Sequence, residues 1–130
     1  MLVKSAAEIL RKVKKNTEIV TIDEAQWFGI KLVAAVQKLL EKKKYIIVAG
    51  LAMTFDRQPF VPMPQLLAMA DKVNKLNAIC SLCGKEAVYH KKINKESFQV
   101  SALKPDRRFV ARLDASIFQA RCRNCFSKKP

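Results

Sequence analysis

Two C-x-x-C pairs limit what this chain can fold into more than any other feature of its sequence. One pair runs from Cys80 to Cys83 and the other from Cys122 to Cys125, and together they contain all four cysteines of the 130 residues. Two residues between cysteines let one turn aim both sulfurs at a single cation, and two such turns complete a tetrahedral shell of four thiolates. The spacing therefore predicts a Zn²⁺ site whose ligands are Cys80, Cys83, Cys122 and Cys125.

The same cysteines are also compatible with two disulfides or with a redox C-x-x-C pair. Nothing in the sequence indicates the secretion that disulfides usually accompany, and a redox pair does not need a matching second pair. A site closed by four thiolates leaves no position open for a substrate, so we expect a structural metal. The residues between the pairs, 84–121, are then a basic loop or hairpin that the metal ties at its base. Metal removal is expected to unfold residues 76–130 and to spare the remainder.

The net charge of the chain limits the kinds of partner that it is expected to bind. It carries 25 basic and 11 acidic residues, a formal net charge of +14. Residues 76–130 alone hold twelve basic and four acidic residues, a net charge of +8. Such a positive field favours partners that carry phosphate. Nucleic acid, nucleotides and an acidic membrane surface all satisfy this condition.

The sequence gives no sign of a membrane span or a targeting segment. The longest apolar stretch, Tyr45 to Met53, is far shorter than the ~20 residues that a membrane-spanning helix needs. The first residues lack the apolar core of a signal peptide. We therefore expect a cytoplasmic protein that does not enter a membrane.

Alternating strand and helix patterns precede the first cysteine pair. Ser5 and Glu8 form a capping-box pattern at the start of a helix, in which the Glu8 carboxylate would return a bond to the Ser5 amide. The further expected elements are a mostly buried strand over 18–22, a helix over 28–44, a strand over 45–49 and a helix from Gln65 to about Lys75. Two continuous apolar strands with a helix between them predict a right-handed unit in a parallel sheet. We expect an α/β domain over residues 1–75 and a zinc-binding subdomain over residues 76–130.

Functional groups in parallel sheets gather beyond the carboxyl ends of the strands. Here those ends carry Asp23-Glu24 and the proline-rich segment from Gly50 to Pro64. An apolar strand followed by Asp-Glu is typical of a Walker B element, in which the Asp holds Mg²⁺ and the Glu acts as a base. Acidic residues after a strand are common, so this pair alone is a weak signal.

The three glycines exclude two common phosphate-binding loops from these residues. Gly29, Gly50 and Gly84 are far apart in the sequence. Neither the G-x-x-x-x-G-K-[ST] loop nor the G-x-G-x-x-G turn can be formed from them. The usual grip on the phosphates of a nucleoside triphosphate is therefore missing from the sequence.

Several motifs, in order, resemble those of the type II thymidine kinases. Ile22 to Phe28 resembles the signature I-D-E-x-Q-F-F, and the segment from Ala49 through Phe60 resembles A-G-L-D-x-x-F-R-x-x-P-F. Residues from Pro62 to Leu76 continue the bacterial pattern, and Cys122 to Cys125 resembles the closing C-R-x-C. The similarity runs from about Ser5 to Cys125. It implies a partial P-loop, RecA-like parallel sheet and a small zinc-ribbon-like lasso subdomain.

The resemblance also implies an activity, its cofactors and an assembly. Type II thymidine kinases transfer the γ-phosphoryl group of ATP, with Mg²⁺, to the 5′-hydroxyl of thymidine in deoxynucleoside salvage. Glu24 matches the family's general base, which takes the proton of that hydroxyl, and Asp23 matches the acid linked to Mg²⁺. Family members are commonly tetramers, so a homo-oligomer is expected.

Other positions match substrate-binding residues of the family. Trp27 falls where the family places a phenylalanine against the base, and Leu51 and Phe55 match residues that line the nucleoside pocket. Phe118 takes the place of a lasso tyrosine, and Arg57 is expected to be a phosphate or structural contact. Together, Trp27, Phe55 and Phe118 would give a flat base an aromatic slot; alternatively, they are ordinary core residues.

The sequence also departs from the family pattern. Family members begin with a strand and a Walker A loop, and these residues begin after that region, so we expect a truncated chain that is inactive alone. A missing strand would also leave an apolar surface and a sheet edge open to self-association. Ala52 replaces a usual aspartate, Leu113-Asp114 stands where the lasso has a glycine pair, and His90 replaces a small residue near the pocket. These differences leave the nucleoside specificity open.

Two other interpretations remain. A basic Cys₄ zinc element could bind nucleic acid through phosphates, although no recognition helix or aromatic RNA motif stands out. A degenerate gene product without activity is the other.

Overall fold

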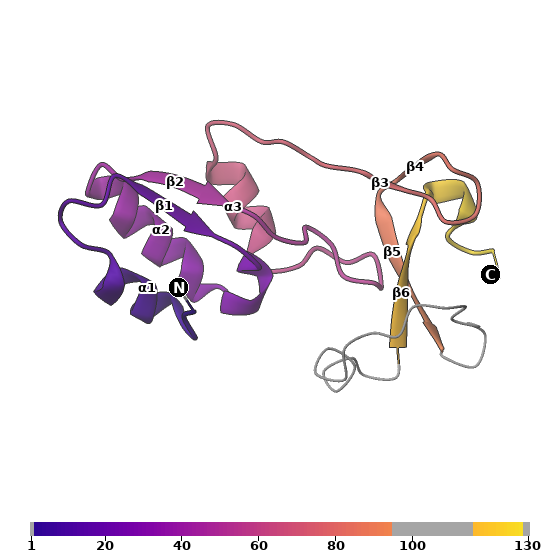
Figure 1. The fold of residues 1–130 in the computed structure, drawn as a ribbon, viewed down its shortest axis with the longest axis horizontal. Helices are drawn as coiled ribbons and strands as arrows, with labels where there is room; N and C mark the ends of the chain where they lie inside the picture. Colours follow the sequence, from indigo (N-terminus) through magenta and orange to yellow (C-terminus); the bar gives the residue numbers. More distant parts are fainter. Residues whose placement is uncertain (1, 95–115, 129–130) are drawn as a thin grey trace. The chain divides into compact units, whose positions relative to one another are not determined.

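The computed structural model describes residues 2–94 and 116–128 (Figure 1). Leu113 and Asp114 of the expected lasso lie outside the described residues. The chain divides into two units: the first contains residues 1–54 and 58–74, and the second contains residues 55–57 and 75–130. Within the described residues, no helix has both the length and the apolar character to cross a membrane.

The first helix, α1 (Ala6–Lys12), begins as its capping sequence predicts. Ser5 is the N-cap, and its Oγ accepts a hydrogen bond from the amide of Glu8 at 3.2 Å. The expected return bond to the Ser5 amide is wrong in detail. The Glu8 carboxylate instead accepts from the Lys4 amide at 2.9 Å and pairs with Lys12 at 2.8 Å. A carboxylate in the first turn of a helix is stabilised by the helix dipole with either partner.

A parallel strand pair forms the centre of the first unit. Strand β1 (Ile19–Ile22) pairs with β2 (Tyr45–Val48), in a register that places Ile19 beside Tyr45 and Ile22 beside Val48. Helix α2 (Lys31–Glu41) lies between them in the chain. The predicted strand–helix–strand unit with a parallel sheet is therefore confirmed. It brings the residues after Ile22 and those after Val48 to the same edge of the sheet (Figure 1).

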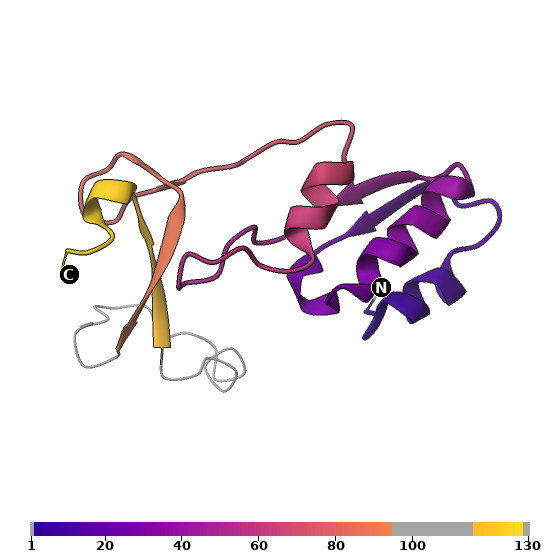
Figure 2. The same ribbon diagram turned by 180° about the vertical axis from the view of Figure 1, so that it is seen from behind.

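The core of the first unit lies between this sheet and the helices. Helix α2 packs on β2 and α1 packs on α2, and the two opposite views show both helices on the same side of the strand pair (Figures 1 and 2). The buried apolar residues are Ala6, Ile9, Val20, Ile22, Ala25, Leu32, Ala35, Val36, Leu39, Met63 and Leu66.

The prediction that residues 18–22 are mostly buried is wrong in the described structure. Burial alternates along β1: Val20 and Ile22 face the helices, whereas Ile19 is exposed. Tyr45 and Ile47 of β2 are exposed as well. Successive strand residues point to opposite faces of a sheet, and here only one face is covered by described residues.

Helix α2 is shorter than the expected helix over 28–44. A short 3₁₀ helix, η1 (Ala25–Phe28), precedes it, and Gly29 follows with φ of 64°, a conformation that separates the two. At the other end, Lys43 has φ of 56°, and its amide donates to Leu40 O at 2.8 Å. A left-handed residue at this place ends a helix and satisfies a free carbonyl.

Helix α3 (Met63–Met69) ends well before the predicted limit near Lys75. Ala70 takes an extended conformation, with φ of −73° and ψ of 135°. Beyond it Val73 and Leu76 are exposed. A helix this short depends on burying an apolar face. These later apolar residues have no partner in the described core, so continued helix would gain little.

The second unit consists of small antiparallel pairs. Strand β3 (Ala78–Ile79) pairs with β4 (Glu86–Ala87), and β5 (Tyr89–Asn94) pairs with β6 (Ser116–Arg121), which is followed by the 3₁₀ helix η3 (Arg123–Cys125). The four cysteines gather beside these strands. The predicted fold class, an α/β chain with a small parallel sheet and a zinc-ribbon-like cysteine subdomain, is therefore confirmed.

Candidate functional site

The acidic pair lies directly after β1. Asp23 and Glu24 are both exposed, and Glu24 adopts the left-handed conformation, with φ of 52° and ψ of 40°. Such a φ is uncommon for a residue other than glycine. Asp23 Oδ1 accepts the Glu24 amide hydrogen at 2.8 Å. This contact stabilises the turn that carries the Glu24 side chain beyond the sheet edge.

Backbone bonds join the ends of the two parallel strands. The Ala49 amide donates to Ile22 O at 2.8 Å, and the Ala25 amide donates to Ala49 O at 3.0 Å. These bonds continue the pairing of β1 and β2 beyond the sheet. They hold the turn after the acidic strand against the chain that leads to Leu51.

Gln26 connects the acidic pair to the second strand end through its side chain. It is only 3% exposed. Its Oε1 accepts the Leu51 amide hydrogen at 3.0 Å, and its Nε2 donates to Oε2 of Glu24. The buried Gln26 side chain thus contacts both Glu24, the predicted general base, and the backbone of Leu51, a predicted nucleoside-pocket residue.

The backbone at Gly50 approaches Gln26 too closely for a side chain. An added Cβ would lie 2.7 Å from Gln26 Oε1, 3.0 Å from Met63 Sδ and 3.2 Å from the Ala25 nitrogen. Real Cβ atoms essentially never approach other heavy atoms within 3.0 Å. A glycine is therefore what permits this contact between the two strand ends.

Of the three predicted aromatic residues, Trp27 lies in the first unit, and Phe55 and Phe118 lie in the second. Trp27 is 71% exposed and packs edge-to-face on Phe60, with ring centroids 5.5 Å apart. In the second unit, Phe55 and Phe118 lie 6.0 Å apart with their planes tilted by 42°. Both of these rings are also partly exposed. Of the three predicted aromatic residues, these two are the pair that lies together within one unit.

His90 adjoins this second pair. Its ring lies 5.7 Å from that of Phe118, in an edge-to-face arrangement. Burial lowers the pKa of the His90 imidazole from its ordinary value of 6.5, because the charged form loses hydration. At neutral pH the ring is therefore uncharged, and it extends the aromatic surface of Phe118.

Three cations of the second unit lie over the rings of Phe55 and Phe126. The Arg57 guanidinium is 4.8 Å from the ring centre of Phe126, and the Lys92 ammonium is 5.4 Å from that of Phe55. Lys91 also faces Phe126, at 5.8 Å. These five residues and Asp56 line an open hollow. The cations make it attractive to an anionic group.

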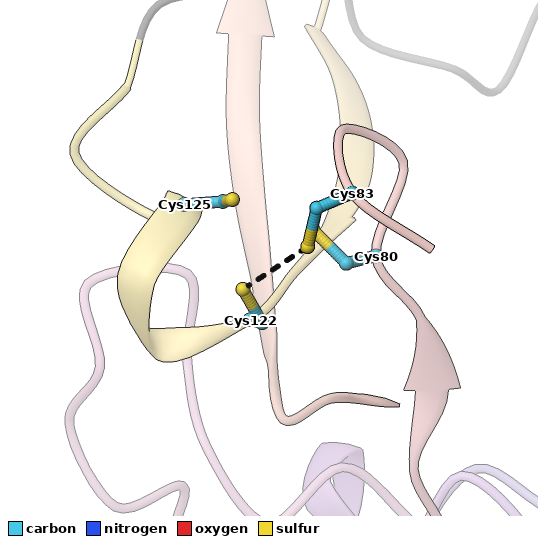
Figure 3. Close-up of side chains that lie close together, drawn as sticks. All are labelled: Cys80, Cys83, Cys122 and Cys125. Atoms are coloured by element: carbon cyan, nitrogen blue, oxygen red, sulfur yellow. Dashed lines mark hydrogen bonds between the residues drawn. The ribbon is translucent and has the colours of Figure 1, made fainter. Parts of the chain in front are cut away.

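The four cysteines converge on one point (Figure 3). Their sulfurs all lie within 4.8 Å of one another, and Sγ of Cys83 and Cys122 are 3.7 Å apart. Zinc–sulfur bonds of about 2.3 Å in a tetrahedron place the sulfurs about 3.8 Å apart. The cluster is therefore of the right size and composition to hold a metal ion of this kind.

Backbone hydrogen bonds shape the turn that carries the first cysteine pair. The Cys80 amide donates to Lys85 O at 2.8 Å, and the Gly84 amide donates to Cys80 O at 3.0 Å. Gly84 has φ of 70°, a conformation that a glycine adopts without strain. The Ser81 amide donates to Ala120 O at 3.0 Å and so ties the first turn to the strand before Cys122.

The sulfurs oppose one another's ionisation. Hydrogen bonding, first from the Cys122 backbone, lowers the pKa of the Cys80 thiol to about 6. The interaction with the Cys122 side chain, followed by burial, raises the pKa of the Cys125 thiol to about 12. Burial opposes ionisation of the Cys122 thiol, but hydrogen bonds from Cys125 and Cys83 outweigh it and lower its pKa as well. Ionisation of Cys125 is resisted, so four thiolates together need a cation at their centre.

Sequence reasoning assigned no role to two buried polar residues. Gln26 was part of the recognised motif, but only the fold reveals that it touches both Glu24 and Leu51. Arg121 is fully buried beside Cys122, and its Nη2 donates to Gln119 Oε1. Its Nε and Nη1 have no hydrogen-bond partner within the described residues.

Comparison with known proteins identifies similar sequences. The family model described as thymidine kinase matches residues 2–126. A thymidine kinase from Rhodothermus sp. is 38% identical over 121 residues, which cover 93% of this chain and 52% of the relative. A thymidine kinase from Coprothermobacter proteolyticus is 56% identical over 70 residues, which cover 54% of this chain and 35% of that relative. The chain thus spans about half the length, or less, of these curated relatives.

Proposed function

The chain belongs to the thymidine kinase family, and we propose from this premise that it serves the transfer of the γ-phosphoryl group of ATP to the 5′-hydroxyl of thymidine. The observation that carries the proposal is the placement of Asp23 and Glu24. They stand at the carboxyl end of β1, and Gln26 ties Glu24 to the chain after β2. Carboxylates at this edge of a parallel sheet are suitably placed to act on a ligand bound there.

Glu24 is the proposed general base. An ionised carboxylate accepts the hydrogen of the 5′-hydroxyl and makes the oxygen a better nucleophile as the bond to phosphorus forms. The side chain is exposed, so a sugar hydroxyl can reach it. Its position is limited by the Gln26 contact, which leaves Glu24 Oε1 available for the substrate.

Asp23 is the proposed partner of Mg²⁺. One of its oxygens accepts the Glu24 amide hydrogen, and the other is directed to no protein donor within the described residues. Mg²⁺ bound with ATP would neutralise the negative charge on the transferred phosphoryl oxygens. Carboxylate oxygen is the ligand type that this ion prefers.

The base of the nucleoside is assigned to aromatic side chains. Phe55 and Phe118 offer partly exposed rings in the second unit, and Trp27 offers one in the first. Leu51 contributes an exposed apolar side chain beside Gln26. Arg57 is assigned to phosphate, because its guanidinium has no carboxylate partner within the described residues.

The four cysteines are assigned to structural Zn²⁺. A closed Cys₄ shell holds the two turns together and leaves no site for a reacting group. These 130 residues contain no G-x-x-x-x-G-K-[ST] sequence. We therefore assign to them nucleoside binding and proton transfer, not the grip on the β- and γ-phosphates, and expect no thymidine phosphorylation by the purified 130-residue chain. We also propose that the protein forms a homo-oligomer, which in this family is commonly a tetramer. Its proposed role is deoxynucleoside salvage in the cytoplasm.

Calorimetric titration of the zinc-loaded chain with thymidine tests this proposal. Phe55→Ala is expected to weaken binding about fivefold or more, because stacking of one base on an aromatic ring contributes about 1–3 kcal/mol. Tyr45→Ala is the matched control, since Tyr45 is an exposed aromatic residue on β2 in the first unit. The proposal is contradicted if thymidine does not bind, or if both variants bind it equally well.

Nucleic-acid binding by the second unit is a second candidate function. The hollow formed by Phe55, Arg57, Lys91, Lys92 and Phe126 favours it, since cations beside exposed rings are typical of single-strand binding surfaces. A filter-binding titration with a single-stranded oligonucleotide at several salt concentrations separates the two functions. Affinity that falls steeply with salt and depends on Lys91 and Lys92 supports this candidate. Weak binding that is unaffected by their replacement excludes it.

A further inference from the structure

We infer that Gln26 is a positioning residue that sets the Glu24 carboxylate and couples it to the backbone of Leu51. The inference rests on the proposed function of Glu24 as the group that meets the 5′-hydroxyl. It adds a specific claim: the buried Gln26 amide fixes the position of the general base, Glu24, relative to the backbone of Leu51.

The chemistry of the two contacts fixes the orientation of the amide. The Leu51 backbone N–H can only donate, so the group 3.0 Å from it must be the oxygen of Gln26. The NH₂ group then necessarily faces Glu24, whose ionised carboxylate can only accept. This orientation of the Gln26 amide therefore satisfies both partners. With the amide turned by 180°, its NH₂ would face the Leu51 N–H and its oxygen would face the Glu24 carboxylate.

Few side chains can replace glutamine here. Glutamate keeps an oxygen for the Leu51 amide but places a second carboxylate against Glu24. Methionine has a similar length but offers neither contact. Asparagine is shorter by one methylene and cannot span from the turn after β1 to the chain after β2. A primary amide of this length is what the two contacts require.

Because Gln26 is buried, the loss of either contact is expected to be costly. Gln26 is only 3% exposed, so water cannot readily replace a partner that is lost. The neighbouring Gly50 has no side chain to separate Gln26 from the second strand end. By contrast, Glu24 itself is exposed and sits on a left-handed turn, where a long side chain would otherwise sample several rotamers. The buried amide therefore restricts the exposed acid.

Hydrogen exchange of the Leu51 amide tests one contact directly. Gln26→Met removes the acceptor, and we expect exchange of this amide to become at least tenfold faster. Gln26→Glu retains an acceptor oxygen, and we expect the rate to stay within about threefold of the wild-type rate. Gln37→Met, at an exposed position of α2, is the matched control and should change nothing. Equal exchange in the wild type and Gln26→Met would overturn the claim for Leu51.

Nucleoside affinity tests the second contact. The ratio of the affinities for thymidine and 5′-deoxythymidine measures the bond between the 5′-hydroxyl and Glu24. We expect a ratio of about ten or more in the wild type, and a fall towards one in both Gln26→Glu and Gln26→Met. The affinity for 5′-deoxythymidine itself should change less than threefold in Gln26→Glu, because the Leu51 contact persists. A purely structural role would lower both affinities together and leave the ratio unchanged.

The outcomes separate this inference from the proposed function. A wild-type ratio near one, or no thymidine binding at all, contradicts the role of Glu24; the exchange measurement then still decides whether Gln26 holds the Leu51 amide. A large wild-type ratio that survives both substitutions contradicts the positioning role alone. Thermal unfolding of each variant verifies that the protein compared is folded.

Discussion

Removal of the metal is expected to unfold the second unit and to leave the first unit folded. The buried hydrophobic cluster of the second unit consists of Cys80, Ala87, Cys122 and Cys125, with Ala120 packed against it, and Ile93 and Arg121 are buried outside this cluster. Three of the four buried residues of the cluster are thus proposed metal ligands. Burial of an alanine methyl contributes only about 0.8 kcal/mol, whereas structural zinc contributes apparent free energies of about 10–16 kcal/mol in small zinc-binding peptides. The metal is therefore the dominant stabilising contact here.

The first unit has an independent source of stability. Its core includes Leu32, Val36 and Leu39 of α2 and Val20 and Ile22 of β1, and none of its buried apolar residues is a cysteine. We therefore expect the strand pair and its helices to persist without metal. The two units respond differently because one core is apolar and the other consists mainly of thiols.

The assay is a pair of ¹H–¹⁵N correlation spectra, recorded before and after an excess of chelator. Amides of residues 78–94 and 116–125 should move to random-coil positions, and those of residues 6–48 should keep their dispersion. Chelator already saturated with zinc is the control, and added zinc should restore the first spectrum. Cys125→Ser should reproduce the chelated spectrum at low zinc. The reasoning is refuted if β5 and β6 keep their shifts without metal, or if both units collapse together.

Three further predictions concern individual positions. Gly50→Ala should lower the free energy of unfolding by about 1–3 kcal/mol in a urea titration, because the added methyl would lie 2.7 Å from Gln26 Oε1; an unchanged midpoint would contradict this. The His90 imidazole, the only one in the chain, should titrate below pH 6.5 by NMR. Because the unfolded state then binds the proton first, stability should fall as the pH drops below 6.5 and level off below the folded-state pKa; a pKa at or above 6.5 would be the opposite result. Replacement of exposed Tyr45 and Ile47 by threonine should shift the chain towards monomer in light scattering, and an unchanged mass would exclude this face from self-association.

Features set by neighbouring residues were predicted well from the sequence. The Ser5 cap is of this kind. The parallel pairing of β1 with β2 and the convergence of the two cysteine pairs join distant positions, but each is signalled by local patterns, namely two apolar runs and two C-x-x-C spacings. A β-branched run favours a strand regardless of its surroundings. A turn of two residues between cysteines likewise aims its sulfurs without help from the remainder of the chain.

Features set by distant residues were predicted less well. The apolar sequence of β1 does not reveal whether a second layer covers Ile19, and this residue is exposed in the described structure. Helical spacing continued past Met69, but the residues beyond it have nothing to pack on. The contact of Gln26 with Leu51 joins positions 25 residues apart, so no local pattern could reveal it. The boundary near residue 76 and the roles of the site residues remain predictions.

The most direct test of the account measures whether Glu24 meets the 5′-hydroxyl of a nucleoside. The affinities of the wild type and of Glu24→Ala for thymidine and for 5′-deoxythymidine form a four-way cycle. We predict that loss of the hydroxyl costs the wild type about tenfold or more in affinity, as expected for a hydrogen bond to a charged acceptor, and costs Glu24→Ala almost nothing. If the hydroxyl contributes equally with and without the Glu24 carboxylate, this acid is not the group that receives the substrate's proton.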